Sequence, residues 1–98
     1  MSLDSSETTT SLTHTVDFLK SFSNADRIRI ALLLREHTLM SVTDLSNQLK
    51  MNRSSLSYHL VKMRHGGFLN WQWKNAEQHY FLADPAVTQM LDRLFPNP

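Results

Sequence analysis

The residues with the most distinctive chemistry lie between Asn52 and Gly67, in the segment NRSSLSYHLVKMRHGG. This segment holds hydroxyls, an aromatic ring, imidazoles and cations, but no acidic residue. Short donors and acceptors contact base edges in a nucleic-acid groove, and cations contact phosphates. The segment therefore favours a contact with nucleic acid, and the alternative is an ordinary amphipathic helix that happens to lack acids.

The same segment predicts a helix with two different faces. Asn52 is a favourable N-cap because its side-chain oxygen accepts from first-turn amides, and Gly66-Gly67 end the helix because glycine adopts the left-handed conformation without steric cost. Leu56, Leu60 and Met63 recur at helical spacing and form an apolar face. At about 100° per residue, the opposite face consists of Ser54, Tyr58, Val61, Lys62 and His65.

Formal charge is distributed unevenly along the 98 residues. Segment 27–74 holds eight Lys and Arg against two acids, a formal charge of +6, whereas the residues on either side together carry −5. A basic centre between acidic ends predicts one surface for a polyanion and separate surfaces for other partners. Within the basic segment, Arg27 and Arg29 are expected to be phosphate contacts or solvated charges.

Several classes of protein are disfavoured by what the sequence lacks. Without cysteine, the chain forms neither a disulfide nor a thiolate metal site. No apolar run approaches the ~18 residues of a membrane span, and the N-terminus lacks the pattern of a signal peptide, so we expect a cytoplasmic protein that contacts no membrane. An enzyme is not expected, because the stretch of sequence that holds Ser54, Ser55 and His59 contains no acid to orient a base, and neither glycine lies in a phosphate loop. No cofactor is expected.

The chain is long enough for one small domain. Residues 1–10 are rich in Ser and Thr and predict a flexible N-terminal tail, and residues 11–98 predict the folded domain. Helical spacing begins at Ser11, and the pattern Ser-x-x-Asp predicts further helix starts at Ser23 and Ser41. The last of these helices is short and is followed closely by the Asn52 helix, which is typical of a helix-turn-helix.

After Gly66-Gly67 the apolar period changes from 3.6 to 2 residues, which predicts a β-hairpin over residues 69–82. Such a hairpin is a wing whose tip can touch the DNA backbone, with Lys74 as a candidate contact. Trp71 and Trp73 are expected to be half-buried in the small sheet, in preference to stacking on bases. Asp84-Pro85 then begins a last helix. The predicted fold is mainly α with a small β-hairpin, a winged helix-turn-helix of order α-α-α-α-β-β-α.

The first and last predicted helices carry more apolar surface than one small core requires. Their stripes predict a two-fold homodimer, which would place two copies of the Asn52 helix about one turn of DNA apart, ~34 Å, to match an inverted repeat. The predicted interface consists of Leu12, Val16, Leu19, Val87, Met90, Leu91 and Leu94.

Four segments, in this order and spacing, carry a resemblance to a known family. They are residues 19–34 (LKSFSNADRIRIALLL), 42–49 (VTDLSNQL), 52–68 (NRSSLSYHLVKMRHGGF) and 80–85 (YFLADP). They are similar to the second helix, the third helix, the recognition helix and the Tyr-x-Leu-x-Asp-Pro stretch of the ArsR/SmtB family of bacterial winged-helix regulators. The resemblance implies a homodimeric repressor that binds double-stranded DNA at an imperfect inverted repeat.

The resemblance also implies which residues contact DNA. It places an arginine, two serines and a Tyr-His pair at the family's glutamine, serines and His-His pair, and the helical spacing adds a lysine. The predicted DNA contacts are therefore Arg53, Ser54, Ser57, Tyr58, His59, Lys62 and Lys74. His59 lies on the flank between the two faces, so it can instead anchor the helix through a backbone hydrogen bond. The wing departs from the family pattern, since Trp73 stands where arginine is common and the tip lacks glycine.

The metal sites of the family are missing from the sequence. The chain has Ser41-Val42-Thr43 where cysteine sensors have Cys-Val-Cys, and no histidine follows His79. Soft ions need thiolates, so we expect no metal at either site, and a signal that is an unidentified small-molecule effector, a partner protein or the protein's own concentration. Two alternatives stay open: a winged-helix module that binds protein instead of DNA, and a metal sensor with a non-standard site built on His14 and Asp17.

Overall fold

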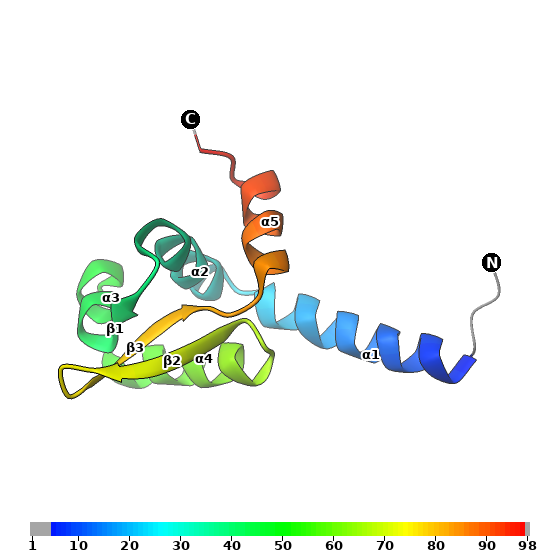
Figure 1. The fold of residues 1–98 in the computed structure, drawn as a ribbon, viewed down its shortest axis with the longest axis horizontal. Coiled ribbons are helices and arrows are strands. Elements are labelled where there is room, and N and C mark those ends of the chain that lie inside the picture. Colours follow the sequence, from blue (N-terminus) through cyan, green and yellow to red (C-terminus); the bar gives the residue numbers. More distant parts are fainter. Residues whose placement is uncertain (1–4, 98) are drawn as a thin grey trace.

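The computed structural model describes the backbone of residues 5–97 and the side chains of residues 12–97. Within that range the chain forms five helices and a three-stranded sheet (Figure 1). The elements are α1 (Ser5–Phe22), α2 (Ala25–His37), β1 (Met40–Ser41), α3 (Val42–Leu49), α4 (Arg53–His65), β2 (Leu69–Lys74), β3 (Glu77–Leu82) and α5 (Pro85–Leu94). The predicted winged helix-turn-helix is confirmed, with one strand more than the hairpin required.

Helix α1 begins earlier than its apolar pattern, at Ser5 and not at the predicted Ser11. Ser and Thr have only moderately lower helix propensity than Ala, and adding residues to an existing helix costs far less than starting one. Of the predicted tail, residues 1–4 lie outside the described residues, and the division into a tail and a folded domain stays a prediction.

Side-chain caps begin four of the helices. Asn24 Oδ1 accepts from the amides of Asp26 and Arg27 at 2.9 and 3.2 Å, so the predicted cap at Ser23 is wrong by one residue. The Ser23 hydroxyl instead donates to the Lys20 carbonyl oxygen at 2.8 Å and ends the preceding helix. The other three caps are as predicted: Ser41 for α3, Asn52 for α4 and Asp84 for α5.

The sheet is antiparallel, with the strand order β1-β3-β2. Strand β1 pairs Met40 with Tyr80, and it was not predicted because two residues show no period of their own. The hairpin of β2 and β3 turns at Asn75 and Ala76, whose φ angles are 53° and 60°. Asn tolerates this left-handed conformation, whereas the Cβ of Ala disfavours it, so the turn at Ala76 is strained.

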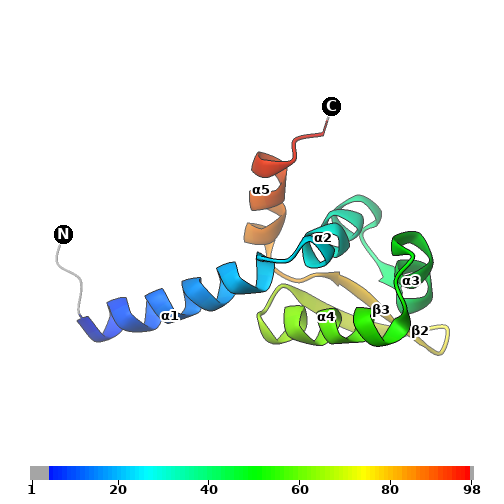
Figure 2. The same ribbon diagram turned by 180° about the vertical axis from the view of Figure 1, so that it is seen from behind.

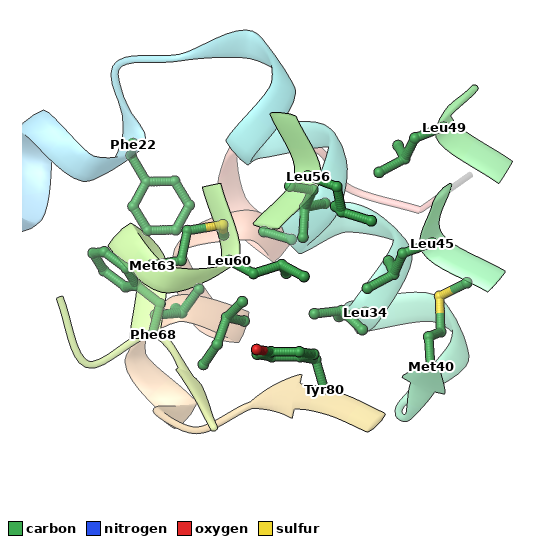
Figure 3. Close-up of a cluster of buried hydrophobic side chains, with 14 of the residues drawn as sticks. Phe22, Leu34, Met40, Leu45, Leu49, Leu56, Leu60, Met63, Phe68 and Tyr80 are labelled. Carbon is green, nitrogen blue, oxygen red and sulfur yellow. The ribbon is translucent and has the colours of Figure 1, made fainter. Parts of the chain in front are cut away.

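The core lies between α2, the helix-turn-helix and the sheet (Figure 3). Ile30, Ala31 and Leu34 of α2 are buried. Buried residues of the end of α1, of α3, α4 and α5 and of all three strands belong to the same cluster. Val87 and Leu91 of α5 are 0% and 1% exposed, so they belong to this chain's own core. This corrects the predicted dimer interface, since side chains without exposed surface cannot form it.

Helix α1 extends away from the body of the molecule, at a wide angle to α5 (Figures 1 and 2). Its last turns are anchored by aromatic packing: the ring centroids of Phe18 and Phe22 lie 4.5 and 4.6 Å from that of Phe68. A Cβ at Gly66 would lie 2.8 Å from the Phe68 ring, so this packing requires glycine there. This aromatic packing joins the C-terminal end of α1 to the segment that directly follows α4. None of the described helices is long and apolar enough to cross a membrane.

Candidate nucleic-acid interface

Helix α4 turns its apolar side into the core and its polar side to solvent. Leu56, Leu60 and Met63 are buried, as the helical spacing predicted. The opposite face presents a guanidinium, hydroxyls, a phenol ring, an ammonium and an imidazole, with Tyr58 57% exposed. The exposed residues of α4 as a whole are Arg53, Ser54, Ser55, Ser57, Tyr58, Val61, Lys62, Arg64 and His65. This face therefore carries the donors and cations that base edges and phosphates require.

The first residue of α4 is tied to α3 and to the wing. Arg53 Nη2 donates to the Thr43 hydroxyl, which in turn donates to Glu77 Oε1. The Thr43 amide donates to the same carboxylate oxygen at 2.9 Å. The hydrogen bond from the Thr43 hydroxyl, with that from its amide, lowers the pKa of Glu77 below its ordinary value of 4.5, and the charge of Arg53 acts in the same direction. The wing and α3 thus help to hold the Arg53 guanidinium in place.

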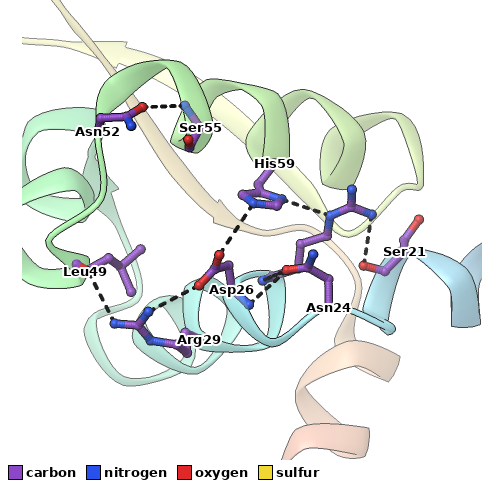
Figure 4. A network of polar contacts seen from close by, with 9 residues as sticks. Ser21, Asn24, Asp26, Arg29, Leu49, Asn52, Ser55 and His59 are labelled. Atoms are coloured by element: carbon purple, nitrogen blue, oxygen red, sulfur yellow. Dashed lines mark hydrogen bonds and ion pairs between the residues drawn. The ribbon is translucent and has the colours of Figure 1, made fainter.

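His59 is 8% exposed and lies beneath the outward face, between α4 and the start of α2 (Figure 4). Its Nδ1 accepts from Arg27 Nε at 3.1 Å, and its Nε2 lies 3.9 Å from Asp26 Oδ2. An accepting Nδ1 places the proton of the neutral ring on Nε2, facing the carboxylate. His59 therefore anchors the helix through the Arg27 side chain, in place of the backbone hydrogen bond considered from the sequence.

Two cations lie over the ring of Tyr58. The Arg27 Cζ is 5.9 Å and the Lys62 Nζ 5.7 Å from the ring centroid. Arg27 also donates from Nη1 to the Ser21 carbonyl oxygen at 3.4 Å, which links it to the end of α1. Arg29 behaves differently: it pairs with Asp26 at 3.2 Å and donates to the Leu49 carbonyl oxygen at 3.3 Å, so it joins α2 to α3.

On the wing, Trp73 is 66% exposed and Lys74 at the strand's end is exposed as well. Trp71 is half-buried, as expected, whereas the exposed Trp73 is not. Arg64 of α4 lies over the Trp71 ring at 5.4 Å, and the Trp71 Nε1 is buried with no hydrogen-bond partner in the described part of the chain. The wing strand is therefore packed on the C-terminal half of α4, with its far end open to solvent.

Two further groups of exposed side chains are apolar, one along α1 and one at the C-terminal end of α5, which points away from α1 (Figures 1 and 2). Leu12 is 58%, Leu19 56% and Leu94 63% exposed, although each is a large apolar side chain. Val16 of α1 and Phe95 after α5 are exposed as well, and Met90 is half-buried. Of the seven residues predicted for a dimer interface, five have exposed surface in the single chain: Leu12, Val16, Leu19, Met90 and Leu94.

The contacts that hold the outward face were not evident from the sequence. Arg27 and His59 lie 32 residues apart, and Thr43 and Glu77 34 apart, so no local spacing joins them. The flank position of His59 was the available signal that it points neither fully out nor fully in. Among the residues that the structure describes, His, Asp and Glu do not gather into any group of three that could hold a metal ion.

Comparison with known sequences gives one consistent result. Residues 24–70 match a family model described as "Bacterial regulatory protein, arsR family". The chain is 33% identical over 79 residues to the transcriptional activator HlyU of Vibrio cholerae, covering 81% of this chain and 72% of that protein. It is 31% identical over 86 residues to the transcriptional repressor PagR of Bacillus anthracis, covering 88% of this chain and 86% of that protein.

Solved structures show the same arrangement of elements. The crystal structure of PagR matches with a TM-score of 0.79 and 29% identity, over 87% of this chain and 97% of that one. A homodimeric winged helix-turn-helix DNA-binding domain from Mycobacterium bovis matches with a TM-score of 0.85 over 96% of this chain and 86% of that one. The identity to the latter is 21%, so this likeness shows the shared fold.

Proposed function

The chain belongs to the ArsR family of bacterial regulatory proteins, and we propose that it is a homodimeric repressor that binds an inverted repeat in double-stranded DNA. The observation that carries the proposal is the outward face of α4, which is exposed, rich in donors and free of acids. In a helix-turn-helix the second helix enters the major groove with its N-terminal residues against base edges. We propose base contacts by Ser54, Ser57 and Tyr58, and phosphate contacts by Lys62 and the wing's Lys74.

The dimer is supported by the apolar surface that the single chain leaves uncovered. Exposed apolar patches of this kind are uncommon on monomers and mark protein contacts. A two-fold axis between α1 helices would cover Leu12, Val16 and Leu19 with their own copies, because the same patch meets itself across such an axis. Leu94 lies at the end of α5, where it can extend the same interface. The M. bovis domain with the same fold is described as homodimeric.

Repression is the regulatory direction that needs the fewest additional contacts. A dimer that occupies an operator blocks other proteins there by volume alone, whereas activation requires a further surface for the transcription machinery. The two named relatives divide, HlyU being described as an activator and PagR as a repressor. We propose that the protein acts in the cytoplasm, where bacterial DNA lies.

The signal that releases DNA is proposed to be something other than a metal at the family's cysteine positions. Ser41 Oγ accepts from the Asp44 amide at 3.0 Å as the α3 cap, and the Thr43 hydroxyl is held between Arg53 and Glu77. Both side chains therefore have structural partners, and neither supplies a thiolate. Zinc, nickel and cadmium titrated against the DNA complex should leave it intact. Release by stoichiometric, sub-micromolar zinc would favour the non-standard site with His14 and Asp17.

Binding to duplex DNA is the direct test. Duplexes that bind the full chain are selected from a random pool, and the protein is then titrated with the selected duplexes at several salt concentrations. Sedimentation of the free protein is measured in parallel. We expect an inverted repeat with half-sites about 10 base pairs apart, a dimer, and an affinity that falls steeply with salt. An affinity for duplexes that salt does not change would contradict DNA binding and favour a protein-binding module. A monomer at high micromolar concentration would contradict the proposed dimer.

A further inference from the structure

A hollow of about 390 Å³ lies where the end of α1, the start of α2 and the C-terminal half of α4 meet. It adjoins the outward face of α4, because Tyr58, Lys62 and His65 follow Ser54 along the same helical stripe. Its lining residues include the cations Lys20, Arg27 and Lys62, the phenol ring of Tyr58, His65 and one acid, Asp17. The hollow thus has an excess of positive charge beside the surface proposed to enter the major groove.

Arg27 is held in a fixed orientation at this hollow. Its Nε donates to His59 Nδ1 at 3.1 Å, and its Nη1 donates to the Ser21 carbonyl oxygen at 3.4 Å. These two bonds use two of the five guanidinium N–H groups, which leaves an Nη1 and Nη2 pair for a bidentate contact with an oxyanion. A buried histidine that accepts from an arginine is a costly way to hold a merely solvated charge, since His59 itself loses its hydration.

The neighbouring cations repel one another unless an anion joins them. Arg27 and Lys62 both lie within 6 Å of the Tyr58 ring centroid, at 5.9 and 5.7 Å. The ring attracts each cation but carries no net charge, so it does not neutralise them. Arg29, on the same helix, is already paired with Asp26 and bonded to a backbone carbonyl. The structure therefore distinguishes two arginines that the sequence did not: Arg29 has an acidic partner, and Arg27 lies beside another cation.

We propose that this hollow binds a phosphate group of the DNA backbone, next to the bases contacted by α4, with Arg27 and Lys62 as its ligands and His59 as the residue that positions Arg27. The proposal rests on the proposed function. It adds a backbone contact outside the helix-turn-helix, because Arg27 reaches the DNA from α2 while α1 supplies the carbonyl that holds it. The chemistry recognised is a phosphate oxyanion, and the DNA backbone is its proposed source.

The salt dependence of DNA binding tests the phosphate contact. Each cation removed from a complex changes the slope of log K against log salt by about 0.9, and a dimer loses two. Arg27→Gln should therefore reduce the slope by about 1.8 and weaken binding about 60-fold at 0.1 M salt, for specific and non-specific duplexes alike. The matched control is Arg29→Gln, which removes the same charge two residues away and should change the slope much less. Lys62→Gln, on an exposed position, gives a second measurement should Arg27→Gln fail to fold.

The positioning role of His59 is tested by a double-mutant cycle. His59→Leu should weaken DNA binding although every cation remains, and adding Arg27→Gln to it should have little further effect. His59→Gln keeps an acceptor for Arg27 and should restore most of the affinity. An equal loss of DNA affinity from Arg27→Gln in the wild-type and His59→Leu proteins would show that His59 has only a structural role. It would overturn the positioning role of His59.

Two further outcomes separate this inference from the proposed function. If the wild-type protein binds its operator and neither Arg27→Gln nor Lys62→Gln changes the salt slope, the phosphate site is wrong while the function stands. If the wild-type protein binds no duplex, the function fails as well. Inorganic phosphate added at millimolar concentration should not raise the melting temperature of the free dimer. A rise that Arg27→Gln abolishes, without any change in the salt slope, would identify a small-anion site and overturn the DNA assignment.

Discussion

Helices α1 and α4 are both amphipathic, but the chain covers opposite sides of them. Helix α4 buries Leu56, Leu60 and Met63 and leaves its polar face in solvent, whereas α1 packs through the rings of its last turns and leaves Leu12 and Leu19 exposed. Burial of apolar surface is favourable by roughly 25 cal/mol per Å², so the α1 stripe gains by contact with another protein surface. The face of α4 gains from charged and hydrogen-bonding groups instead. The kind of face that each helix leaves uncovered therefore indicates the kind of partner that it contacts.

The largest expected effect comes from a charge in the α1 stripe. Leu19→Glu should give a folded monomer, and operator affinity should fall by roughly 100-fold or more because the two half-sites are no longer bound together. Sedimentation and anisotropy titrations measure the two changes. His14→Glu adds the same charge on the opposite side of α1 and should change neither. A Leu19→Glu protein that remains a dimer would show that the α1 stripe is not the dimer contact.

A smaller effect is expected from the face of α4. Ser57→Ala should reduce discrimination between the operator and a mismatched site by about 1–3 kcal/mol where a base contact is lost, while the protein remains a dimer. Gln89→Ala, an exposed polar residue on α5, serves as the control. Competition titrations with the two duplexes give the difference. Equal weakening of both duplexes would show that Ser57 contacts the backbone and not a base.

The hairpin turn at the wing tip directly follows Lys74, a proposed phosphate contact, and its backbone conformation should affect mainly the stability of the fold. Ala76 has a φ of 60°, which glycine adopts without the steric cost that Cβ imposes. Ala76→Gly should therefore raise the free energy of unfolding by about 1 kcal/mol, as measured by urea denaturation, because Asn-Gly suits this turn. Dimerisation should stay unchanged. A decrease in the free energy of unfolding would contradict the strain assigned to Ala76.

The smallest effect concerns Glu77, which joins the wing to Thr43 and Arg53. Its pKa is lowered below 4.5 in the folded chain, so the ionised carboxylate stabilises the fold above that pH. The contribution is lost as the pH falls through the lowered folded-state value. Glu77→Gln should make unfolding less dependent on pH in this acid range, and Glu36→Gln, on an exposed residue of α2, is the control. Identical acid-denaturation curves for wild type and Glu77→Gln would contradict the assignment.

Local pattern was enough to predict the helices, the hairpin and the outward face of α4. Caps such as Asn52 and Asp84 act over three residues, so they are visible in the sequence. The apolar stripe of α5 shows what local pattern does not predict. Its period indicated which residues share a face, but not that Val87 and Leu91 are buried in this chain's own core while Leu94 is exposed. That distinction depends on how far the neighbouring elements extend.

The candidate site was predictable in its exposed residues and not in its supports. Ser54, Ser57 and Lys62 follow from the helical period, and they are exposed. His59 holds Arg27 across 32 residues, and the Thr43–Glu77 bond crosses from α3 to the wing. Such pairs form when tertiary packing brings two elements together, and no spacing in the chain records them. The assignment of Ser54, Ser57 and Lys62 as DNA contacts, and of His59 as a positioning residue, stays a prediction.

The chain's two tryptophans both lie on β2, with ring centroids 5.6 Å apart. Tryptophan fluorescence of the unlabelled protein therefore reports the wing and the adjoining end of α4, where Arg64 lies over the Trp71 ring. Because α1 contains no tryptophan, the same signal is blind to the pairing of α1 helices. Trp73, which is 66% exposed, should be accessible to a soluble quencher such as iodide, and Trp71 much less so. Protection of Trp73 from the quencher upon addition of DNA would place the wing against the duplex without any substitution or dye.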